Sequence, residues 1–225
     1  MKIYYSKDGK IIKWDDLSQL KNGDYLFYNK QFDKTEIEIS FPNLLSGRNM
    51  FEDCTKLTSF DGDLSSLVNG TKMFYWCTSL KSFSGDLSSL VNGYNMFYGT
   101  SLTSFSDDLS SLVYGNWMFG YTTKLTSFSG DLSSLVYGNL MFYNTKLTSF
   151  SGDLSSLVDG TNMFNSTSFT SFSGDLSSLV NGTNMFNECT SFNTFDGKNL
   201  KKLVFADGMF NNCKLSISSI ERFAE

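Results

Sequence analysis

The sequence predicts an α/β repeat protein: a solenoid whose short parallel strands stack into a ladder, with loops and short helical turns elsewhere in each unit. A Met-Phe pair recurs at steps of 22 or 23 residues, with a last step of 24. The residues between the pairs repeat as well, as in Leu80–Phe97, LKSFSGDLSSLVNGYNMF. A fixed period of this length is typical of a solenoid, and a parallel β-helix is the alternative architecture. The pairs begin at Met50, Met73, Met96, Met118, Met141, Met163, Met185 and Met209.

The Leu-x-x-Phe piece of each unit, Leu80–Phe83 in this example, is the predicted strand. It is short, and Thr, Ser and Phe suit a pleated ladder. Stacked units would pair these strands in parallel at about 4.8 Å per unit. We call one unit a rung, and the residues at one position of successive rungs a column.

The rest of each rung contains a turn, a glycine and the Met-Phe pair. Asp-Leu-Ser-Ser-Leu predicts one short helical turn, because Asp is a favoured N-cap. Length differences between rungs fall just after the Met-Phe pair, which predicts a surface turn at residues 52–54, 75–77 and 98–99. The repeated Leu, Phe and Met side chains should point inward. One column holds only glycine, which implies a positive φ or a close contact: Gly47, Gly70, Gly93, Gly115, Gly138, Gly160 and Gly182.

We expect one continuous structural domain with a cap at each end of the solenoid, because the end rungs would otherwise expose apolar surface. Residues 1–45 form the predicted N-terminal cap, with a hairpin over 1–15, a degenerate repeat and the strand-like Ile37-Glu38-Ile39. Residues 46–215 form the solenoid. Residues 216–225 form the C-terminal cap, in which Ser218–Phe223 is compatible with a final helix.

Composition argues against several functions. The net charge is −5, and acids outnumber bases between residues 49 and 197, so nucleic acid and anionic membranes are not expected partners. The chain has no histidine and no Cys-x-x-Cys spacing, and no nucleophile–base pair breaks the repeat pattern. It has no run of about 18 apolar residues, so no membrane insertion is expected. We therefore predict a protein that is not an enzyme and has no cofactor.

The four cysteines are Cys54, Cys77, Cys189 and Cys213. Cys54 and Cys77 fall in one column on adjacent rungs. We interpret them as buried thiols, with a disulfide between them as the alternative, since the redox compartment is not known from the sequence.

The repeat resembles a known family. Leu80-x-x-Phe83, Leu87, Leu90, Met96-Phe97 and a Cys-Thr-Ser-Leu such as Cys77–Leu80 look like the BspA-like leucine-rich repeats of bacterial and protist surface proteins, in their Met-Phe branch. The resemblance covers about residues 50–215. It implies a right-handed leucine-rich-repeat solenoid, a role in adhesion or recognition, and a cell-surface or extracellular location. The N-terminus, MKIYYSKDGK, has no apolar segment of a standard signal peptide, so a cytoplasmic location or a place in a larger particle stays open.

Two polar columns have a structural and a functional interpretation. The first is an aspartate column in which capping of the helical turn is expected, and calcium bridging between rungs is the alternative: Asp63, Asp86, Asp108, Asp131, Asp153 and Asp175. The second is a serine column on the strands, either solvated or matched to a regular ligand lattice: Ser59, Ser82, Ser104, Ser127, Ser149 and Ser171.

Aromatic residues of the central rungs are the candidate binding site. They stand where other rungs have Asn, Thr, Asp or Glu, and they would form an exposed patch if these positions lie at the surface. The alternative is that some fold over the outer apolar seam and pack. The nine residues are Tyr75, Trp76, Tyr94, Tyr98, Tyr114, Trp117, Tyr121, Tyr137 and Tyr143. The predicted function is recognition of a protein or a glycan by a rigid surface; a spacer or stalk in a larger assembly is the alternative.

Overall fold

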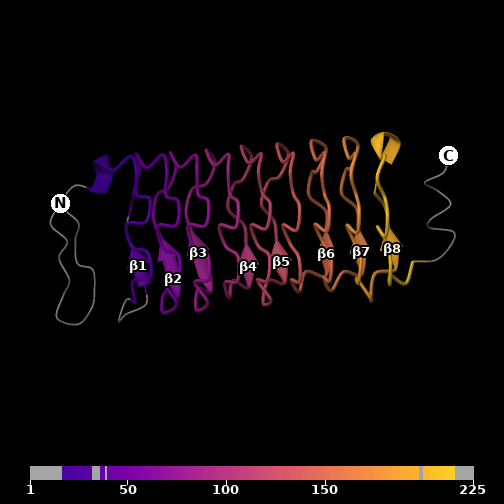
Figure 1. The fold of residues 1–225 in the computed structure, drawn as a ribbon, viewed down its shortest axis with the longest axis horizontal. Helices are drawn as coiled ribbons and strands as arrows, with labels where there is room; N and C mark the ends of the chain where they lie inside the picture. The colour runs from indigo at the N-terminus through magenta and orange to yellow at the C-terminus, as the bar shows by residue number, and fades with distance from the viewer. Residues whose placement is uncertain (1–16, 32–35, 39, 198–199, 216–225) are drawn as a thin grey trace.

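The computed structural model describes residues 17–31, 36–38, 40–197 and 200–215. These residues form an elongated stack of rungs in which the strands lie along one side (Figure 1). The predicted solenoid with a parallel β-ladder is thereby confirmed. The hairpin predicted for residues 1–15 and the cap predicted for 216–225, with its final helix, lie outside the described residues.

Among the described residues, eight short strands form the ladder. They are β1 Glu36–Glu38, β2 Ser59–Asp61, β3 Ser82–Ser84, β4 Ser104–Phe105, β5 Ser127–Phe128, β6 Ser149–Phe150, β7 Ser171–Phe172 and β8 Thr194–Phe195. They pair in parallel as β1-β2-β3, β4-β5 and β6-β7-β8. The register places Phe60 beside Phe83, so each rung repeats the one before it. The strands begin two residues later than predicted, because the Leu80 N–H closes a turn on the Cys77 carbonyl at 2.9 Å.

A second set of hydrogen bonds joins the turns that contain the Met-Phe pair. In these turns every second N–H donates to the next rung: Gly70 to Asn92, Lys72 to Tyr94 and Phe74 to Met96, at 2.8–2.9 Å. Isolated parallel bridges such as Asn69 with Asn92 continue the same pairing. Neighbouring rungs are therefore hydrogen-bonded on two sides, and the outer turns are as regular as the strands.

The core is a set of apolar columns. Most of the repeated Leu, Met and Phe side chains are buried, and the partly buried Phe83 and Phe128 pack against them. The Phe of each Met-Phe pair stacks on that of the next rung; Phe97 and Phe119 are 5.4 Å apart between ring centroids, and Phe119 and Phe142 are 5.5 Å apart with planes inclined by 2°. The strand phenylalanines meet this stack edge-on, as Phe105 meets Phe119 at 4.8 Å. Such offset and edge-to-face contacts add stability beyond that of the buried area.

The helical turn predicted for Asp-Leu-Ser-Ser-Leu is wrong for the inner rungs. There the Asp63 carboxylate accepts the Ser65 N–H at 2.8 Å, and the Leu67 N–H donates to the Leu64 carbonyl at 2.8 Å, which makes a single turn. A short 3₁₀ helix occurs only at the corresponding place near each end of the described stack, as η1 Leu17–Gln19 and η2 Leu200–Lys202.

The glycine column is explained by close contact and not by a positive φ. A Cβ on Gly93 would lie 2.9 Å from the Met118 Sδ of the next rung. The last described rung has Ala206 in this column. No described residue after this rung places a methionine sulfur on Ala206. The column therefore needs glycine where another rung packs on it.

Candidate functional site

Each Met-Phe turn contains two residues in the left-handed region, with φ between 54° and 69°. We call these the first and second left-handed columns. The first precedes the Met-Phe pair: Tyr25, Asn49, Lys72, Asn95, Trp117, Leu140, Asn162, Asn184 and Gly208. The second follows it: Asn29, Asp53, Trp76, Gly99, Tyr121, Asn144, Ser166, Glu188 and Asn212. Asn and Gly adopt this conformation at low cost, whereas other residues lose roughly 1–2 kcal/mol there. The large aromatic residues are thus an unusual choice.

Six of the nine predicted aromatic residues make one continuous group, which we call the aromatic cluster: Tyr75, Trp76, Tyr98, Trp117, Tyr121 and Tyr143. Tyr98 joins the two indoles, with centroid distances of 5.5 Å to Trp76 and 5.7 Å to Trp117. Tyr121 and Tyr143 extend the group by an edge contact of 5.3 Å. The cluster therefore crosses four successive rungs.

Two glycines form the seats of the indoles. A Cβ on Gly99 would lie 2.7–3.1 Å from three atoms of the Trp76 ring, so a face of the ring covers this glycine. A Cβ on Gly120 would lie 2.7 Å from the Trp117 ring and 3.2 Å from Tyr98. Any side chain at either position would displace an indole. The seats therefore place both indoles in close contact with the backbone.

The cluster is partly packed and partly exposed. Trp76 is 40% exposed and Tyr121 is 37% exposed, whereas Tyr75, Tyr98, Trp117 and Tyr143 are half-buried. Burial and the neighbouring tyrosines raise the pKa of Tyr98 and of Tyr143. Their hydroxyls are therefore protonated at neutral pH and can donate hydrogen bonds.

The other three predicted aromatic residues lie apart from this cluster. Tyr114 and Tyr137 stack at 5.3 Å with an angle of 3°, and both are exposed. Tyr94 is exposed as well and belongs to a different column. No ring contact between described residues joins these three to the cluster. The single patch expected from the sequence is therefore divided.

The six aspartates of the aspartate column cap their own turns. In every case Oδ1 accepts the N–H of the serine two residues on, at 2.7–2.9 Å. The Ser88 hydroxyl and N–H lower the pKa of Asp86, and Ser155 does the same for Asp153. Among the described residues no group of three or more His, Cys, Asp or Glu is arranged to hold a metal ion. The serine column lies on the strands, mostly exposed.

The cysteines share a buried column with threonine, which the sequence interpretation missed: Cys54, Cys77, Thr100, Thr122, Thr145, Thr167, Cys189 and Cys213. The thiols are free, as predicted for Cys54 and Cys77. The Cys77 Sγ donates to the Phe51 carbonyl at 3.0 Å, and the Thr122 hydroxyl donates to the Phe97 carbonyl at 3.0 Å. Burial raises the pKa of Cys54 to about 12, so it is not a nucleophile at neutral pH.

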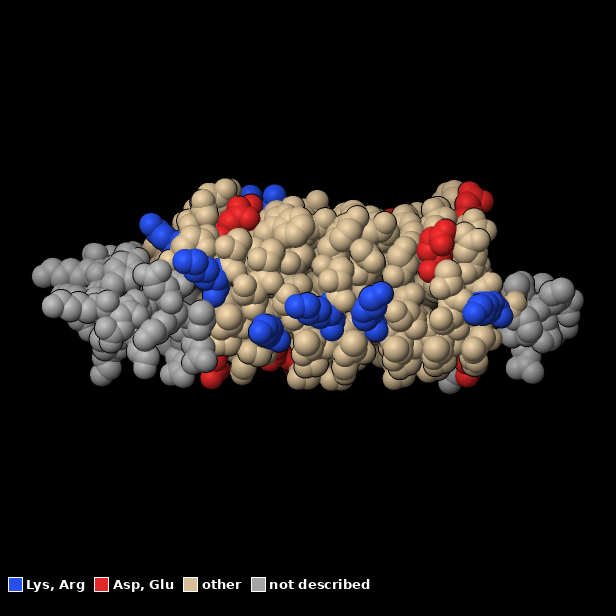
Figure 2. All heavy atoms as spheres, turned by 90° about the horizontal axis from the view of Figure 1, so that it is seen from below, with Lys and Arg blue, Asp and Glu red and all other residues tan. Residues whose placement is uncertain are grey.

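Lysines form a separate exposed row, as Figure 2 shows for the face seen from below. Lys56, Lys124, Lys146 and Lys214 share the column just before the repeated Leu. This column also contains Ser79 and Ser101, so the positive charge is discontinuous along the stack. We assign no site to it.

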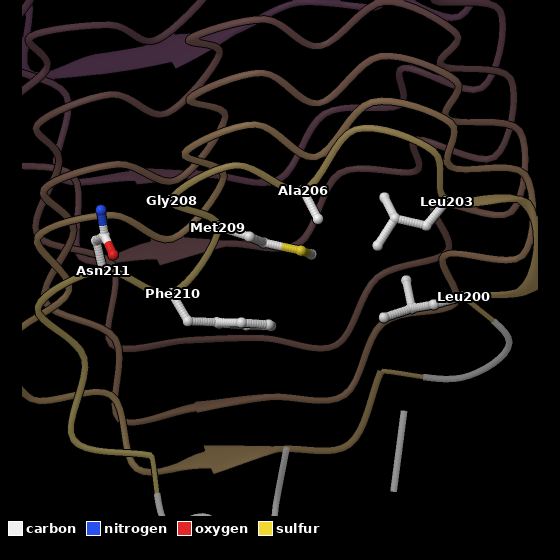
Figure 3. A pocket seen from close by; sticks show the side chains of 7 residues that line it. All are labelled: Leu200, Leu203, Ala206, Gly208, Met209, Phe210 and Asn211. Carbon is white, nitrogen blue, oxygen red and sulfur yellow. The ribbon is translucent and has the colours of Figure 1, made fainter. Parts of the chain in front are cut away.

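An apolar pocket of about 410 Å³ lies on the last described rung (Figure 3). Its lining includes Leu200, Leu203, Met209 and Phe210, which point into the same space. Ala206 also lines it and occupies the glycine column, where inner rungs receive the next methionine. The pocket therefore corresponds to the surface on which, at an inner rung, the next rung packs. This position explains why its lining is apolar.

A comparison with known families agrees with this geometry. The description "BspA type Leucine rich repeat region" matches in six copies, over residues 20–128, 47–159 and 138–223. The chain belongs to the BspA-type leucine-rich-repeat family. The predicted leucine-rich-repeat solenoid is therefore confirmed, and such families commonly bind proteins.

Among solved structures, this BspA-type protein is similar to a leucine-rich cell surface protein of Faecalibacterium prausnitzii A2-165, at 16% identity and a TM-score of 0.46. The match covers 79% of this chain and 43% of that one, so this chain spans less than half of that protein's length. No protein with a curated description matches. Among the described residues no helix is both long enough and apolar enough to cross a membrane.

Proposed function

We propose that this BspA-type protein is a non-enzymatic recognition module that binds its partner through the aromatic cluster. One observation carries the proposal: the rings gather on neighbouring rungs, at positions where flanking rungs with the same backbone have Asn, Asp, Ser or Glu. The backbone does not require aromatic residues there, since Trp76, Trp117 and Tyr121 all occupy left-handed positions.

The cluster also has the physical character of a binding surface. Trp and Tyr dominate binding energy at interfaces, because they bring a large contact area with few rotatable bonds. Contacts between the rings, and the seats on Gly99 and Gly120, hold the cluster in place before any partner arrives. A surface that is already ordered loses little conformational entropy on binding.

The test compares two triple variants. The cluster variant is Trp76→Asn, Trp117→Asn and Tyr121→Asn; the matched control changes the aromatic residues outside the cluster, as Tyr94→Asn, Tyr114→Asn and Tyr137→Asn. Retention is measured on plates coated with mucin and on plates coated with epithelial membrane-protein extract. On a surface that retains the unmodified protein, we expect the cluster variant to bind about tenfold less or weaker still, and the control to bind normally.

Stability is measured alongside binding. Relief of the left-handed strain, roughly 1 kcal/mol per residue, should offset part of the lost ring contacts, at about 0.5–1.5 kcal/mol each. The buried Leu, Met and Phe columns and the inter-rung hydrogen bonds are unchanged in the cluster variant, so we expect it to stay folded. Equal retention of the variant and the unmodified protein, or no retention of either, would overturn the proposal. Loss of function only on deletion of a whole rung would instead favour a spacer.

A further inference from the structure

We propose that the partner is an uncharged, extended carbohydrate chain that lies along the solenoid axis over the aromatic cluster. This inference rests on the proposed function and specifies its ligand. The observations that carry it are the charge of the surrounding turns, the seating of the indoles, the polar groups between the rings and the spacing of the rungs.

Three of the four turns that carry the cluster have no charged residue. Residues 94–106, 114–123 and 137–145 contain no Asp, Glu, Lys or Arg. Equivalent turns nearer the ends are charged, with Glu52 and Asp53 on one side and Glu188 on the other. Protein partners are commonly oriented by complementary charges, and acidic polymers need cations. Lys72, whose ammonium lies 5.0 Å from the Tyr75 ring centroid, is at one edge of the cluster. The central surface therefore suits a neutral ligand.

The indoles are held close to the backbone. Three atoms of the Trp76 ring lie over Gly99, so one face of this ring is against the backbone. The Trp117 ring touches Gly120 through Cε3 and lies parallel to the Tyr121 ring, with planes inclined by 7°. The face of an aromatic ring carries partial negative charge. The aliphatic C–H groups on one side of a sugar ring carry partial positive charge and match such a face. Stacking of this kind is favoured by rings that lie close to the backbone, where the two glycine seats place both indoles.

Neutral hydrogen-bonding groups lie among the rings. The hydroxyls of Tyr98, Tyr121 and Tyr143 belong to the cluster, and Asn144 follows in the second left-handed column. A tyrosine hydroxyl can both donate and accept, and so can an amide. A sugar presents hydroxyls around its edge with the same dual capacity. The cluster therefore offers stacking surfaces and matching polar partners on four rungs.

The spacing favours an extended chain over a single sugar. Trp76, Tyr98, Tyr121 and Tyr143 lie on four successive rungs, with centroid distances of 5.3–5.5 Å between neighbours, close to the spacing of roughly 4.8 Å per rung. Trp117 lies to one side of this line, in the first left-handed column. One rung is close to the length of one sugar unit in an extended β-linked polysaccharide. A chain parallel to the axis would thus meet an aromatic ring at each successive unit.

The first experiment is native gel electrophoresis in gels cast with neutral polysaccharides (hydroxyethylcellulose, mixed-linkage β-glucan, galactomannan and xylan) or acidic ones (polygalacturonate and hyaluronan). We expect at least one neutral polymer to retard the unmodified protein and neither acidic polymer to do so. Retardation should be lost in Trp76→Asn/Trp117→Asn and kept in Tyr114→Asn/Tyr137→Asn. Retardation by acidic polymers alone, or no retardation at all, overturns the inference.

The second experiment separates this inference from the proposed function. The coated plates are treated with periodate, which oxidises sugar diols, or with protease. Carbohydrate recognition predicts that periodate abolishes retention and that Trp76 and Trp117 are required. Retention that survives periodate but is lost after protease overturns the carbohydrate ligand, and it leaves the proposed function intact if the cluster variant still fails to bind. Equal retention of the cluster variant overturns the proposed function itself.

Discussion

In the rung of Met118, the left-handed residues on either side of the Met-Phe pair are Trp117 and Tyr121; in the rung of Met163 they are Asn162 and Ser166. The φ angles agree within a few degrees, between 55° and 61°. The two rungs therefore differ in what they display and not in how they fold. Their common backbone is set by inter-rung hydrogen bonds and inward side chains, so the outward residues can vary.

If the two rungs fold alike, truncation of a core side chain should lower the free energy of unfolding by the same amount in both. This is the largest effect expected. Phe119 and Phe164 are fully buried in the same column. We expect Phe119→Ala and Phe164→Ala each to lower the free energy of unfolding by about 3–5 kcal/mol, measured by urea denaturation. A much smaller loss for Phe119 would mean that the aromatic cluster supports the central rungs from outside.

Substitution in the glycine column should come next. Gly93→Ala and Gly160→Ala force a methyl group toward the methionine of the next rung, so each should cost about 1–3 kcal/mol. A Cβ would lie 2.9 Å from the nearest atom at Gly93 and 3.2 Å at Gly160, so Gly93 should be the more sensitive. Ala206→Gly is the matched control. A large loss from that control would contradict the packing explanation.

The aspartate caps should have intermediate effects and should respond to pH. Replacing one cap with alanine, as in Asp131→Ala, should cost about 1 kcal/mol. The pKa values of Asp86 and Asp153 are lowered in the folded state, so their contribution is present above the unfolded pKa and is lost as pH falls through the folded pKa. Asp107, whose pKa is raised by burial, acts in the opposite direction.

The measurement is urea denaturation between pH 7 and pH 3, monitored by circular dichroism. The unmodified protein should lose stability on acidification, and Asp86→Asn/Asp153→Asn should lose less. An unchanged pH profile in this double variant would show that the caps are not the source of the acid sensitivity.

The smallest effect concerns a left-handed residue outside the aromatic cluster. Leu140 has φ 59° and no aromatic ring. We expect Leu140→Asn to stabilise the fold by about 1 kcal/mol or less, and Asn162→Leu to destabilise it by a similar amount. Thermal denaturation of the two variants checks this. Shifts of the same sign in both would show that backbone strain does not decide these positions.

The repeated residues predicted the fold well, because a side chain that recurs in step with the period must face the same environment in every rung. Leu87, Met96 and Phe97 are buried as expected. Predictions of local structure within a rung were less accurate. Asp-Leu-Ser-Ser-Leu was predicted to form one short helical turn capped by Asp. The aspartate does cap the segment, but in the inner rungs the segment closes a single turn that is not a helix before the chain returns to the ladder.

The candidate site could be predicted only in part. The unusual residues Trp76, Trp117 and Tyr121 identify the region from the sequence alone. Trp and Tyr themselves do not indicate a left-handed conformation, because they disfavour it. The signal that was overlooked is the Asn at the equivalent positions of other rungs, because Asn adopts the left-handed conformation easily. The division of the predicted patch into separate groups could be seen only in the structure. Tyr94 and Tyr98 lie four residues apart in one turn, and only the ring contacts show that Tyr98 belongs to the cluster and Tyr94 does not.

The column that cysteine and threonine share has a practical consequence. In four rungs the protein already places a threonine where others carry a thiol, and Thr122 makes the same kind of bond to a carbonyl as Cys77. We therefore expect that all four thiols can be replaced by threonine with little change in packing. New cysteines on outer turns could then carry spectroscopic labels at intervals dictated by the repeat, which would turn the solenoid into a molecular ruler.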